Sequence, residues 1–404
     1  MNTLPIYLLV LLVLISSPVY IHSQSLDDVK ASLISQISSA TSFSDLPTLV
    51  PPPKPVFSPI IVVGGGLSGL TASLYLLEAG HTVTLIDREG FLGGNSAKAS
   101  SGINGAYTTF QEQENVEDSN ERFLEDTVKS SGRGGEGITG ELVRRMVEGS
   151  KEAVEWLLDR ASIPPPILVG QMGGHTSSRT HRPLSGLAGA AFISGLEKAV
   201  MKYREDGQLK VMTGTRVVET EKVREGGEGD ERSESRKGTN GAFTTGDGIK
   251  LARHAGAGTV DMEMVQVHPT GFSDVPTGFS DTPGRSLILC AEILRGAGSV
   301  LLDRGGSRFV DELETRKHVT DKMNNRGQVE YAIVVPPHAA EATVTHMNIY
   351  TGKGLLHEVE GMEGVRDYIK VRLNGGKEPV EIHDTFKMPI NETSTIPRSA
   401  PTVL

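Results

Sequence analysis

The sequence predicts an α/β fold with a mostly parallel sheet, and three features within residues 60–86 carry that prediction. Ile60-Ile61-Val62-Val63 is a β-branched run typical of a buried parallel strand. A glycine-rich turn and a helical stretch over Leu70–Ala79 follow it, and a second strand is expected over Thr82–Ile86. Parallel strands need a crossover connection, so the order strand, helix, strand indicates a βαβ unit.

The turn after the first strand is a G-x-G-x-x-G motif, with residues 64–69 reading G-G-G-L-S-G. Gly64 permits the tight turn, Gly66 lets the backbone approach a pyrophosphate, and Gly69 lets the helix pack closely on the strand. The phosphates would lie at the positive end of the helix, next to Ser68. We therefore predict a dinucleotide site here, and a glycine-rich turn without a ligand is the alternative.

Asp87 ends the second strand, where its carboxylate would accept hydrogen bonds from a ribose diol. The strand, the glycine turn, the helix and the acid occur in the order and at the spacing of a dinucleotide site, which favours a ligand-binding role for the first motif. A second match, at Gly132, Gly134 and Gly137, follows the polar helical stretch Asn120–Lys129 rather than a strand. We interpret that second match as a surface loop.

Composition narrows the class of protein. A chain of 404 residues suggests about two or three domains. The net charge of −10 argues against a nucleic-acid partner, because such binding leaves a basic footprint. Cys290 is the only cysteine in the sequence, which excludes an intrachain disulfide and a thiolate metal site. Without C-x-x-C or H-E-x-x-H, we expect no protein-bound metal.

Residues 1–24 have the outline of a secretory signal peptide, since Leu4–Ile21 is an almost unbroken apolar run without charged side chains. The run is close to membrane-spanning length and no Lys or Arg precedes it, so a membrane anchor over residues 4–21 is the alternative. Both interpretations predict the secretory pathway, with a protein that is secreted, lumenal in the endoplasmic reticulum, or anchored. Residues 25–57 would form a proline-rich linker, and Asn391-Glu392-Thr393 a glycan acceptor.

Small and hydrogen-bonding residues follow the ribose-binding acid, with residues 93–105 reading G-G-N-S-A-K-A-S-S-G-I-N-G. Such residues suit a backbone laid against a diphosphate and an isoalloxazine ring. The candidate cofactor contacts in this stretch are Gly94, Asn95, Ser96, Ser100, Ser101 and Gly102.

With this stretch the chain resembles the fumarate reductase branch of the succinate dehydrogenase/fumarate reductase flavoprotein superfamily, in particular the soluble, NADH-linked eukaryotic fumarate reductases. The resemblance implies an FAD cofactor and a Rossmann-like FAD-binding domain with an inserted α+β capping domain. It continues through a helix over Glu141–Leu158, with Trp156 on the apolar face as a core residue. For the His/Arg-rich residues 173–183, a solvated or phosphate-facing loop and a substrate contact are both open interpretations.

The motif T-T-G-D-G at 244–248 begins a further predicted helix. Thr244 or Thr245 would cap that helix, because a threonine hydroxyl can accept a hydrogen bond from a free amide of the first turn. The resemblance implies that Asp247 contacts the flavin side of the site.

Three linked motifs extend the resemblance to the substrate: Q-V-H-P-T at 266–270, A-E-I-L-R-G at 291–296 and D-E-L-E-T-R at 311–316. By resemblance, His268 binds a substrate carboxylate and Arg316 donates a proton. Glu292 and Arg295 would form the relay that reprotonates Arg316, and their i,i+3 spacing places them on one face if they are helical. Taken singly, a loop histidine and a surface salt bridge are the plainer interpretations.

The reaction that the resemblance implies is the reduction of fumarate to succinate, with hydride transfer from flavin N5 and protonation by Arg316. Electrostatic stabilisation of the developing carbanion is the expected dominant effect. Arginine has a pKa above about 12, so it could act as an acid only among other cations and a relay carboxylate. NADH is the electron donor by resemblance alone, because the sequence has no second strand-turn-helix fingerprint and no haem C-x-x-C-H motif.

The sequence also departs from the family. Family members place a long segment, with an A-T-G-G-F-like strand and turn, between the strand that resembles residues 215–219 and the T-T-G-D motif. Here residues 221–239 are rich in Glu, Arg, Gly and Ser, which predicts disorder. The family's H-T-M-G-G and G-E-x-x-G-G-x-H-G-x-N-R-L-G-G segments, which carry a second substrate histidine and arginine, do not occur in the sequence. The repeat T-G-F-S-D at 270–274 and 277–281 indicates a local duplication or a faulty gene model.

We predict an FAD-binding domain over residues 58–270, a capping domain over 271–390 with a β-rich end over Val371–Thr385, and a tail over 391–404. The expected partner is a small dicarboxylate, fumarate or succinate, and the oligomeric state stays open. One alternative is another flavin dehydrogenase of the superfamily, of the 3-ketosteroid dehydrogenase or urocanate reductase type. The other is an inactive, truncated flavoprotein.

Overall fold

The computed structural model describes residues 59–131, 138–219, 239–262, 264–272, 288–328 and 330–373, with two short strands at 13–14 and 402–403. The following predictions lie outside these residues: the leader apart from 13–14, the proline-rich linker, the glycine motif at 132–137, the charged run over 220–238, the second T-G-F-S-D copy at 277–281 and the glycan acceptor at 391–393.

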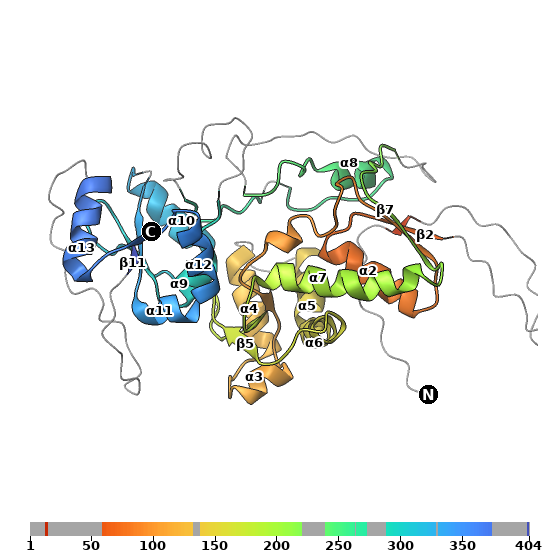
Figure 1. Cartoon of the computed structure of the whole chain (residues 1–404), viewed down its shortest axis with the longest axis horizontal. Coiled ribbons are helices and arrows are strands. Elements are labelled where there is room, and N and C mark those ends of the chain that lie inside the picture. Colours follow the sequence, from red (N-terminus) through yellow and green to blue (C-terminus); the bar gives the residue numbers. More distant parts are fainter. Residues whose placement is uncertain are drawn as a thin grey trace, which may run out of the picture.

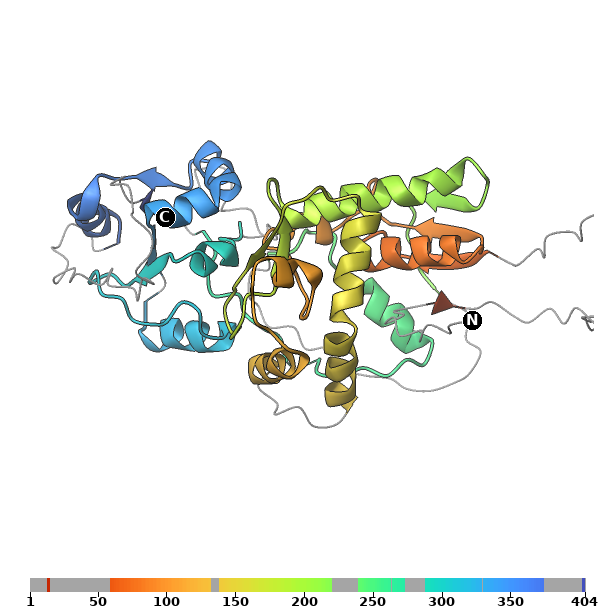
Figure 2. The same cartoon turned by 90° about the horizontal axis from the view of Figure 1, so that it is seen from below.

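The described chain forms two bodies that lie side by side along the long axis (Figures 1 and 2). The N-terminal body comprises the described residues 59–262. The C-terminal body comprises the described residues 264–373 with strand β11 (Thr402–Val403). Both bodies combine helices with a sheet, so the fold is α/β as the sequence predicts.

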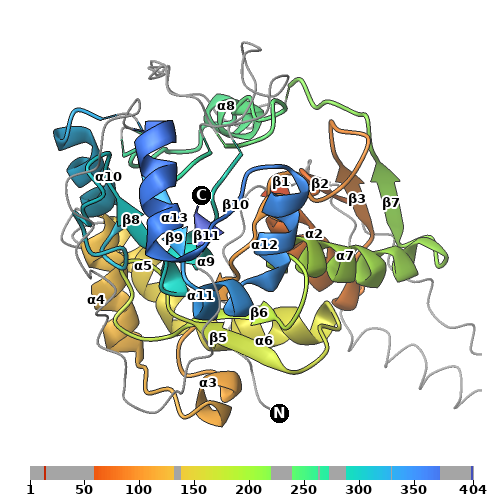
Figure 3. The same cartoon turned by 60° about the vertical axis from the view of Figure 1, so that its left-hand side comes forward.

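A parallel sheet forms the centre of the N-terminal body and confirms the predicted βαβ unit. Strands β2 (Ile60–Val63), β3 (Val83–Ile86) and β7 (Leu209–Met212) pair in parallel, and β1 (Val13–Leu14) adds an antiparallel edge beside β2. Figure 3 shows these four strands next to one another. The β-branched run Ile60–Val63 is therefore a strand of a parallel sheet, as the sequence predicts.

Helix α2 (Leu67–Glu78) connects β2 to β3 and packs along helix α7 (Ala188–Met201). It begins three residues before the predicted Leu70, because Gly66 already acts as the N-cap. The apolar residues of the two helices and of the sheet form one core, which includes the fully buried Leu70, Leu85 and Leu196. The glycine turn is thereby fixed between a buried strand and a buried helix.

The helix predicted over Glu141–Leu158 is two helices, α5 (Ile138–Glu148) and α6 (Ser150–Arg160). The break falls at Gly149, whose ψ of 0° is not helical, and glycine is a poor helix former. At the break, the Ser150 hydroxyl accepts a hydrogen bond from the amide of Ala106. Trp156 is partly buried against the core, which confirms its predicted packing role.

A small antiparallel sheet lies next to the parallel one, with strand order β4-β6-β5. It consists of β4 (Ile103–Asn104), β5 (Ile167–Gly170) and β6 (Thr180–Pro183). The remaining elements of the N-terminal body are helices α3 (Thr109–Gln113), α4 (Asn120–Ser131) and α8 (Asp247–His254) and the short 3₁₀ helices η2 (Ser96–Lys98) and η3 (Lys202–Arg204). Helix α4 confirms the helix predicted over 120–129.

The C-terminal body surrounds an antiparallel sheet with strand order β10-β11-β9-β8. Its elements are α9 (Glu292–Gly296), β8 (Val300–Leu302), α10 (Arg316–Asn325), β9 (Ala332–Val335), α11 (Pro337–Ala342), α12 (Val344–Gly352), β10 (His357–Glu358), α13 (Gly361–Tyr368) and the π-helix η4 (Ile369–Leu373). The β-rich end predicted from Val371 is wrong as far as residue 373, because η4 continues α13 and Ile369 is fully buried.

Two local predictions in the N-terminal body are wrong. Residues 215–219 form no strand. The Thr215 amide donates to the Asp87 carbonyl oxygen at 2.9 Å, but no described strand pairs with the residues that follow, and Val218 is 79% exposed. Helix α8 is capped by Gly246, in the left-handed region at φ +70°, and not by Thr244 or Thr245. Among the described residues, no helix is both long and apolar enough to cross a membrane.

The close approach of Gly69 in α2 to the backbone of Gly64, at the end of β2, leads to a prediction about stability. A Cβ on Gly69 would lie 1.8 Å from the carbonyl oxygen of Gly64, and two backbone segments cannot move apart cheaply. We expect Gly69→Ala to lower the free energy of unfolding by about 3 kcal/mol or more. The matched control is Gly248→Ala in helix α8, where no atom lies within 4 Å of the new Cβ and a gain of about 0.5 to 1 kcal/mol is expected. Equal thermal unfolding midpoints for the two variants would contradict the prediction.

Candidate active site

The glycine turn and Asp87 are joined by a hydrogen bond. Asp87 Oδ2 accepts from the amide of Gly65 at 2.7 Å, and Oδ1 accepts from the amide of Glu89 at 2.8 Å. Gly64, at φ +100°, makes the tight turn that brings Gly65 to the acid. A carboxylate has about four lone-pair sites, so Asp87 keeps acceptor capacity for a ribose diol.

The N-terminus of helix α2 has the character of an anion site. The amides of Gly66 and Ser68 have no hydrogen-bond partner among the described residues, and the Leu67 amide donates to Ser96 Oγ at 3.1 Å. Unpaired amides at a helix start carry the positive end of the helix dipole. A diphosphate would therefore lie beside Ser96, and these residues fit the diphosphate of FAD.

The stretch from Gly94 to Gly102 runs from this helix towards the C-terminal body. Asn95 contacts the segment before α8, since its amide nitrogen donates to Thr244 Oγ1 at 2.7 Å and its oxygen accepts from the Gly241 amide at 2.9 Å. Gly94 lies in the left-handed region at φ +48°. The backbone continues from Asn95 through Ser100 to Ser101, which lines a cavity between the two bodies. At Gly102, with φ +140°, a Cβ would lie 2.4 Å from the His181 carbonyl oxygen.

Asp247 lies at the start of α8 and is paired with two arginines. Its Oδ2 is 3.0 Å from Arg216 Nε and 3.3 Å from Arg88 Nη1. The hydrogen bonds from Arg216 and Thr245 lower the pKa of Asp247 to about 2. The carboxylate is therefore ionised at neutral pH and holds α8 against Arg88, the residue after β3 and Asp87.

A cavity of about 570 Å³ has walls from both bodies. The N-terminal body contributes Ser101 and Gly102 of the predicted cofactor stretch. Gln266, Glu292 and Arg316 of the substrate motifs come from the C-terminal body. The structure thus brings together two groups of predicted site residues that are well over 100 positions apart in the sequence.

Glu292 is buried between two arginines at this cavity. Its Oε2 accepts from Arg316 Nε at 2.9 Å and also from Arg316 Nη2, while Oε1 is 3.5 Å from Arg295 Nη2. Burial opposes ionisation, but Arg316 and Arg295 outweigh it and hold the pKa of Glu292 below its ordinary value. The predicted i,i+3 pair is therefore formed, on helix α9.

The two arginines differ in exposure. Arg295 is 1% exposed, and its Nη1 donates to the Glu312 carbonyl oxygen at 2.8 Å. Burial lowers the pKa of Arg295. Arg316, the first residue of α10, keeps 42% of its side chain exposed and donates from Nη1 to Gln266 Oε1 at 3.3 Å. Only Arg316 of this pair lines the cavity.

His268 lies beside this cluster rather than on the cavity wall. Its Nδ1 is 2.9 Å from the Thr270 carbonyl oxygen and 3.3 Å from the Thr270 amide. Burial and the charge of Arg316 lower the pKa of His268 to about 4. The imidazole is therefore neutral at neutral pH.

The His/Arg-rich residues 173–183 are not a solvated loop, because Arg179 is fully buried. Its guanidinium binds Asp118 in bidentate fashion, at 3.0 and 2.8 Å, and Asp126 at 2.6 Å. The guanidinium also lies over the ring of Phe123, 4.8 Å from its centroid. A buried cation is stable when carboxylates pair with it, which is the physical reason that the solvated interpretation is wrong.

Asn104 and Gln266 line the cavity, although their residue types alone predict no role for them. His175, one of the residues 173–183 for which a substrate contact stayed open, lines it too. Asn104 and Gln266 occur within the motifs S-S-G-I-N and Q-V-H-P-T. Each of these two polar side chains lies within two residues of a predicted site residue, Gly102 or His268. That proximity in the sequence is the feature from which Asn104 and Gln266 could have been predicted as site residues. His175 follows two glycines, and Gly173 permits a close approach, since a Cβ there would lie 2.8 Å from Glu292 Oε1.

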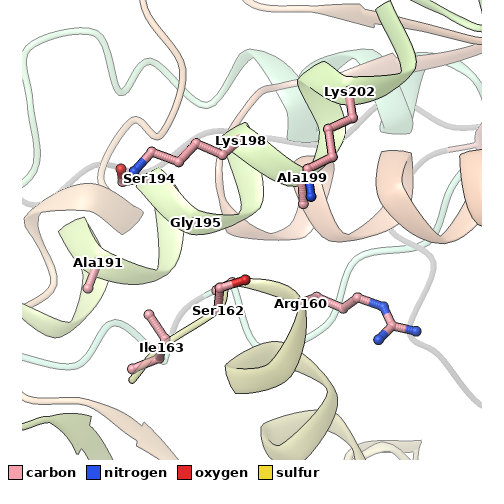
Figure 4. Close-up of a pocket in the computed structure, with 10 residues that line it drawn as sticks. Arg160, Ser162, Ile163, Ala191, Ser194, Gly195, Lys198, Ala199 and Lys202 are labelled. Carbon is pink, nitrogen blue, oxygen red and sulfur yellow. The ribbon is translucent and has the colours of Figure 1, made fainter. Parts of the chain in front are cut away.

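A second hollow, of about 300 Å³, lies between the end of α6 and one face of α7 (Figure 4). Ser162 and Ile163 line it from the chain after α6, Lys198 lines it from α7, and Lys202 lines it from the start of η3. None of the predicted site residues borders it. We therefore assign the candidate active site to the larger cavity.

The chain combines a glycine turn closed on an acid, a helix start with unpaired amides, and a cavity lined by Ser101 and Gly102 of the stretch that follows. These features are typical of a flavin-binding fold. The FAD binding domain family matches residues 59–224 and 197–388, and the chain belongs to that family. Within it, the chain belongs to the fumarate reductase branch of the succinate dehydrogenase/fumarate reductase flavoprotein superfamily.

Relatives with known names support this placement. The chain is 33% identical to the fumarate reductase of Schizosaccharomyces pombe over 75% of its own length and 66% of that protein. It is 32% identical to the NADH:fumarate oxidoreductase of Klebsiella pneumoniae over 74% of its length and 34% of that protein. The chain thus spans less than two thirds of these relatives. A urocanate reductase of Eggerthella lenta is more distant, at 25% identity over 66% of this chain and 48% of that protein.

Among solved structures, the open conformation of a flavocytochrome c3 fumarate reductase is similar, with a TM-score of 0.55 and 25% sequence identity. The match covers 85% of this chain and 65% of that one. This similarity extends the family relationship from the sequence to the arrangement of the elements.

The buried Arg179 network generates a second stability prediction. Arg179→Met would leave the carboxylates of Asp118 and Asp126, which are 1% and 5% exposed, without their cation. We expect a loss of about 3 to 5 kcal/mol in the free energy of unfolding. Arg160→Met, which breaks the exposed pair of Arg160 with Glu78, should cost less than about 1 kcal/mol. Chemical denaturation of both variants measures the difference, and similar losses would show that the network is not stabilising.

Proposed function

We infer that the chain binds FAD and reduces fumarate to succinate at the cavity between its two bodies. The observation that carries this proposal is the contact of Arg316 with Glu292, and of Glu292 with Arg295, on a cavity that Gly102 also lines. The family relationship supports the cofactor, and the names of the relatives support the substrate class.

The cofactor site would consist of the glycine turn, Asp87 and the stretch from Gly94 to Gly102. FAD bound there, once reduced by an electron donor, would supply a hydride from its N5 position. Asp87 would accept from the ribose with its remaining lone pairs, and the amides of Gly66 and Ser68 would donate to the diphosphate. Ser101 and Gly102 would border the ring, because they are the members of the stretch that line the cavity.

Arg316 would deliver the proton that completes the reduction. Arg295 is a second cation on the carboxylate that binds Arg316, so Glu292 connects the two guanidinium groups. Glu292, ionised between them, would take a proton from Arg295 and pass it to Arg316, and solvent would be the final source of that proton. The half-exposed guanidinium of Arg316 reaches the cavity, whereas the buried Arg295 would act only through Glu292.

By resemblance, His268 would bind a substrate carboxylate. Its Nδ1 is 2.9 Å from the Thr270 carbonyl oxygen, which only accepts, so Nδ1 carries the proton of the neutral ring. Nε2 would donate to a carboxylate only once the ring also takes up a proton there. Burial, which keeps the ring neutral, leaves the positive charge of this part of the site on the arginines.

NADH is the electron donor that we propose, and the name of the Klebsiella pneumoniae relative supports it. A urocanate reductase activity is the weaker alternative, because that relative is more distant. The two arginines that flank Glu292 carry one positive charge more than the carboxylate neutralises, and this net positive charge would attract an anionic substrate.

Cofactor binding is tested by the absorbance spectrum of the chain expressed without residues 1–24. We expect bound FAD, and Asp87→Ala should weaken its binding about 10- to 100-fold, because a charged acceptor is worth about 1.5 to 3 kcal/mol. Asp159→Ala, an exposed carboxylate at the far end of α6, should leave the affinity unchanged. A folded, colourless protein that takes up no added FAD would defeat the proposal.

Fumarate reduction is tested with reduced FAD on the same protein. Arg316→Gln should lower turnover by at least about 100- to 1,000-fold with unchanged flavin content. Lys317→Gln, the adjacent and exposed residue of α10, should keep wild-type turnover. Loss of flavin from the Arg316 variant would assign that residue a structural role. A wild-type chain that binds FAD and leaves fumarate unreduced would favour the inactive flavoprotein instead.

A further inference from the structure

Three side chains of the N-terminal body form a hydrogen-bonded row on the cavity wall. Asn104 comes from strand β4, Thr180 from the paired strand β6, and His175 from the turn before β6. Thr180 Oγ1 donates to Asn104 Oδ1 at 2.7 Å, and Asn104 Nδ2 is 3.4 Å from His175 Nε2. All three line the cavity that Arg316 and Gln266 border from the C-terminal body.

These contacts describe the orientation of the Asn104 amide. Thr180 Oγ1 donates to Oδ1, and Nδ2 is the end of the amide that lies next to His175 Nε2. An amide nitrogen only donates, and His175 Nε2 must therefore accept. Of the two N–H bonds on Nδ2, one points to His175. The second is left for a ligand, since Asn104 is exposed on the cavity wall.

His175 is a neutral imidazole here. Burial, together with the charge of Arg179, lowers the pKa of His175, so the ring is neutral at neutral pH. Nε2 accepts in the tautomer that carries its proton on Nδ1, a buried atom with no hydrogen-bond partner among the described residues. The turn that carries it is fixed on both sides. Gln171 Nε2 donates to the His175 carbonyl oxygen at 2.5 Å, and the Gly174 amide donates to the Leu313 carbonyl oxygen at 2.6 Å.

We propose that Asn104 is a specificity-determining residue that donates to the carboxylate of the substrate farther from Arg316, and that His175 is a positioning residue which holds the Asn104 amide. This inference rests on the proposed fumarate reductase function. One end of a dicarboxylate would meet the charged groups around Arg316, and the other end would meet the Asn104 N–H. A ligand without the second carboxylate would leave that N–H unpaired, which is how a hydrogen-bonding site rejects a truncated analogue.

The experiment compares fumarate with crotonate, in which a methyl group replaces one carboxylate. Dissociation constants are measured from the change in the flavin spectrum of the FAD-loaded chain expressed without residues 1–24. We expect Asn104→Ala to lower the preference for fumarate over crotonate about 10- to 100-fold, because a hydrogen bond to a charged group is lost only with fumarate. The affinity for FAD itself should not change.

His175 is tested in the same assay by two variants. His175→Ala should lower the preference for fumarate, since the Asn104 amide loses its partner, and His175→Gln should restore part of it because the glutamine oxygen can accept. A purely structural role would weaken fumarate and crotonate alike, and His175→Gln would not rescue the preference. Ser130→Ala, a polar residue on the wall of the same cavity, is the matched control with an unchanged preference.

The outcomes separate this inference from the proposed function. If the wild-type chain takes up FAD and fumarate leaves its spectrum unchanged, the proposed function fails and this inference fails with it. If fumarate binds to the wild type and Asn104→Ala keeps the full preference over crotonate, this inference alone is overturned. Weaker FAD binding by Asn104→Ala with an unchanged preference would assign Asn104 to the cofactor, which also overturns it.

Discussion

The buried carboxylate of Glu292 is the constraint on which the arrangement of the site depends. A carboxylate that is 5% exposed is costly to bury unless cations pair with it, and here two arginines do so. One of them, Arg295, comes from the same short helix, and the other, Arg316, begins α10. The pairing therefore fixes two segments of the C-terminal body relative to each other at the cavity.

The N-terminal body approaches this carboxylate through a glycine. Gly173 lies so close to Glu292 that a side chain there would collide with it, and Gly174 donates its amide to the Leu313 carbonyl oxygen. Behind this turn, the buried Arg179 joins Asp118 and Asp126, and Asp126 in turn accepts from the Thr176 amide. A buried ionic network thus supports the turn that carries His175 to the cavity.

The two halves of the site differ in their chemistry. The wall from the C-terminal body carries the ion pair of Arg316 with Glu292. The wall from the N-terminal body presents neutral donors and acceptors on Asn104, His175 and Thr180, and its one carboxylate, Asp126, is paired with the buried Arg179. Burial keeps the nearby histidines neutral, because it disfavours the charged form of an imidazole. A site of this kind concentrates its charge where a developing negative charge would need stabilisation.

The sequence by itself determined the parts of the protein that depend on neighbours in the chain. The strand, glycine turn, helix and second strand over residues 60–86 follow from β-branched runs and glycine spacing, and the Glu292–Arg295 pair follows from its i,i+3 spacing. The tertiary structure decided the rest: the break at Gly149, the absence of a strand over 215–219, the burial of Arg179 and the meeting of Asn104 with His175. Strand pairing and ion-pair burial join residues tens of positions apart, and local propensity holds no information on which distant partner will be present. Only packing supplies the partners that decide whether a charged side chain is solvated or buried.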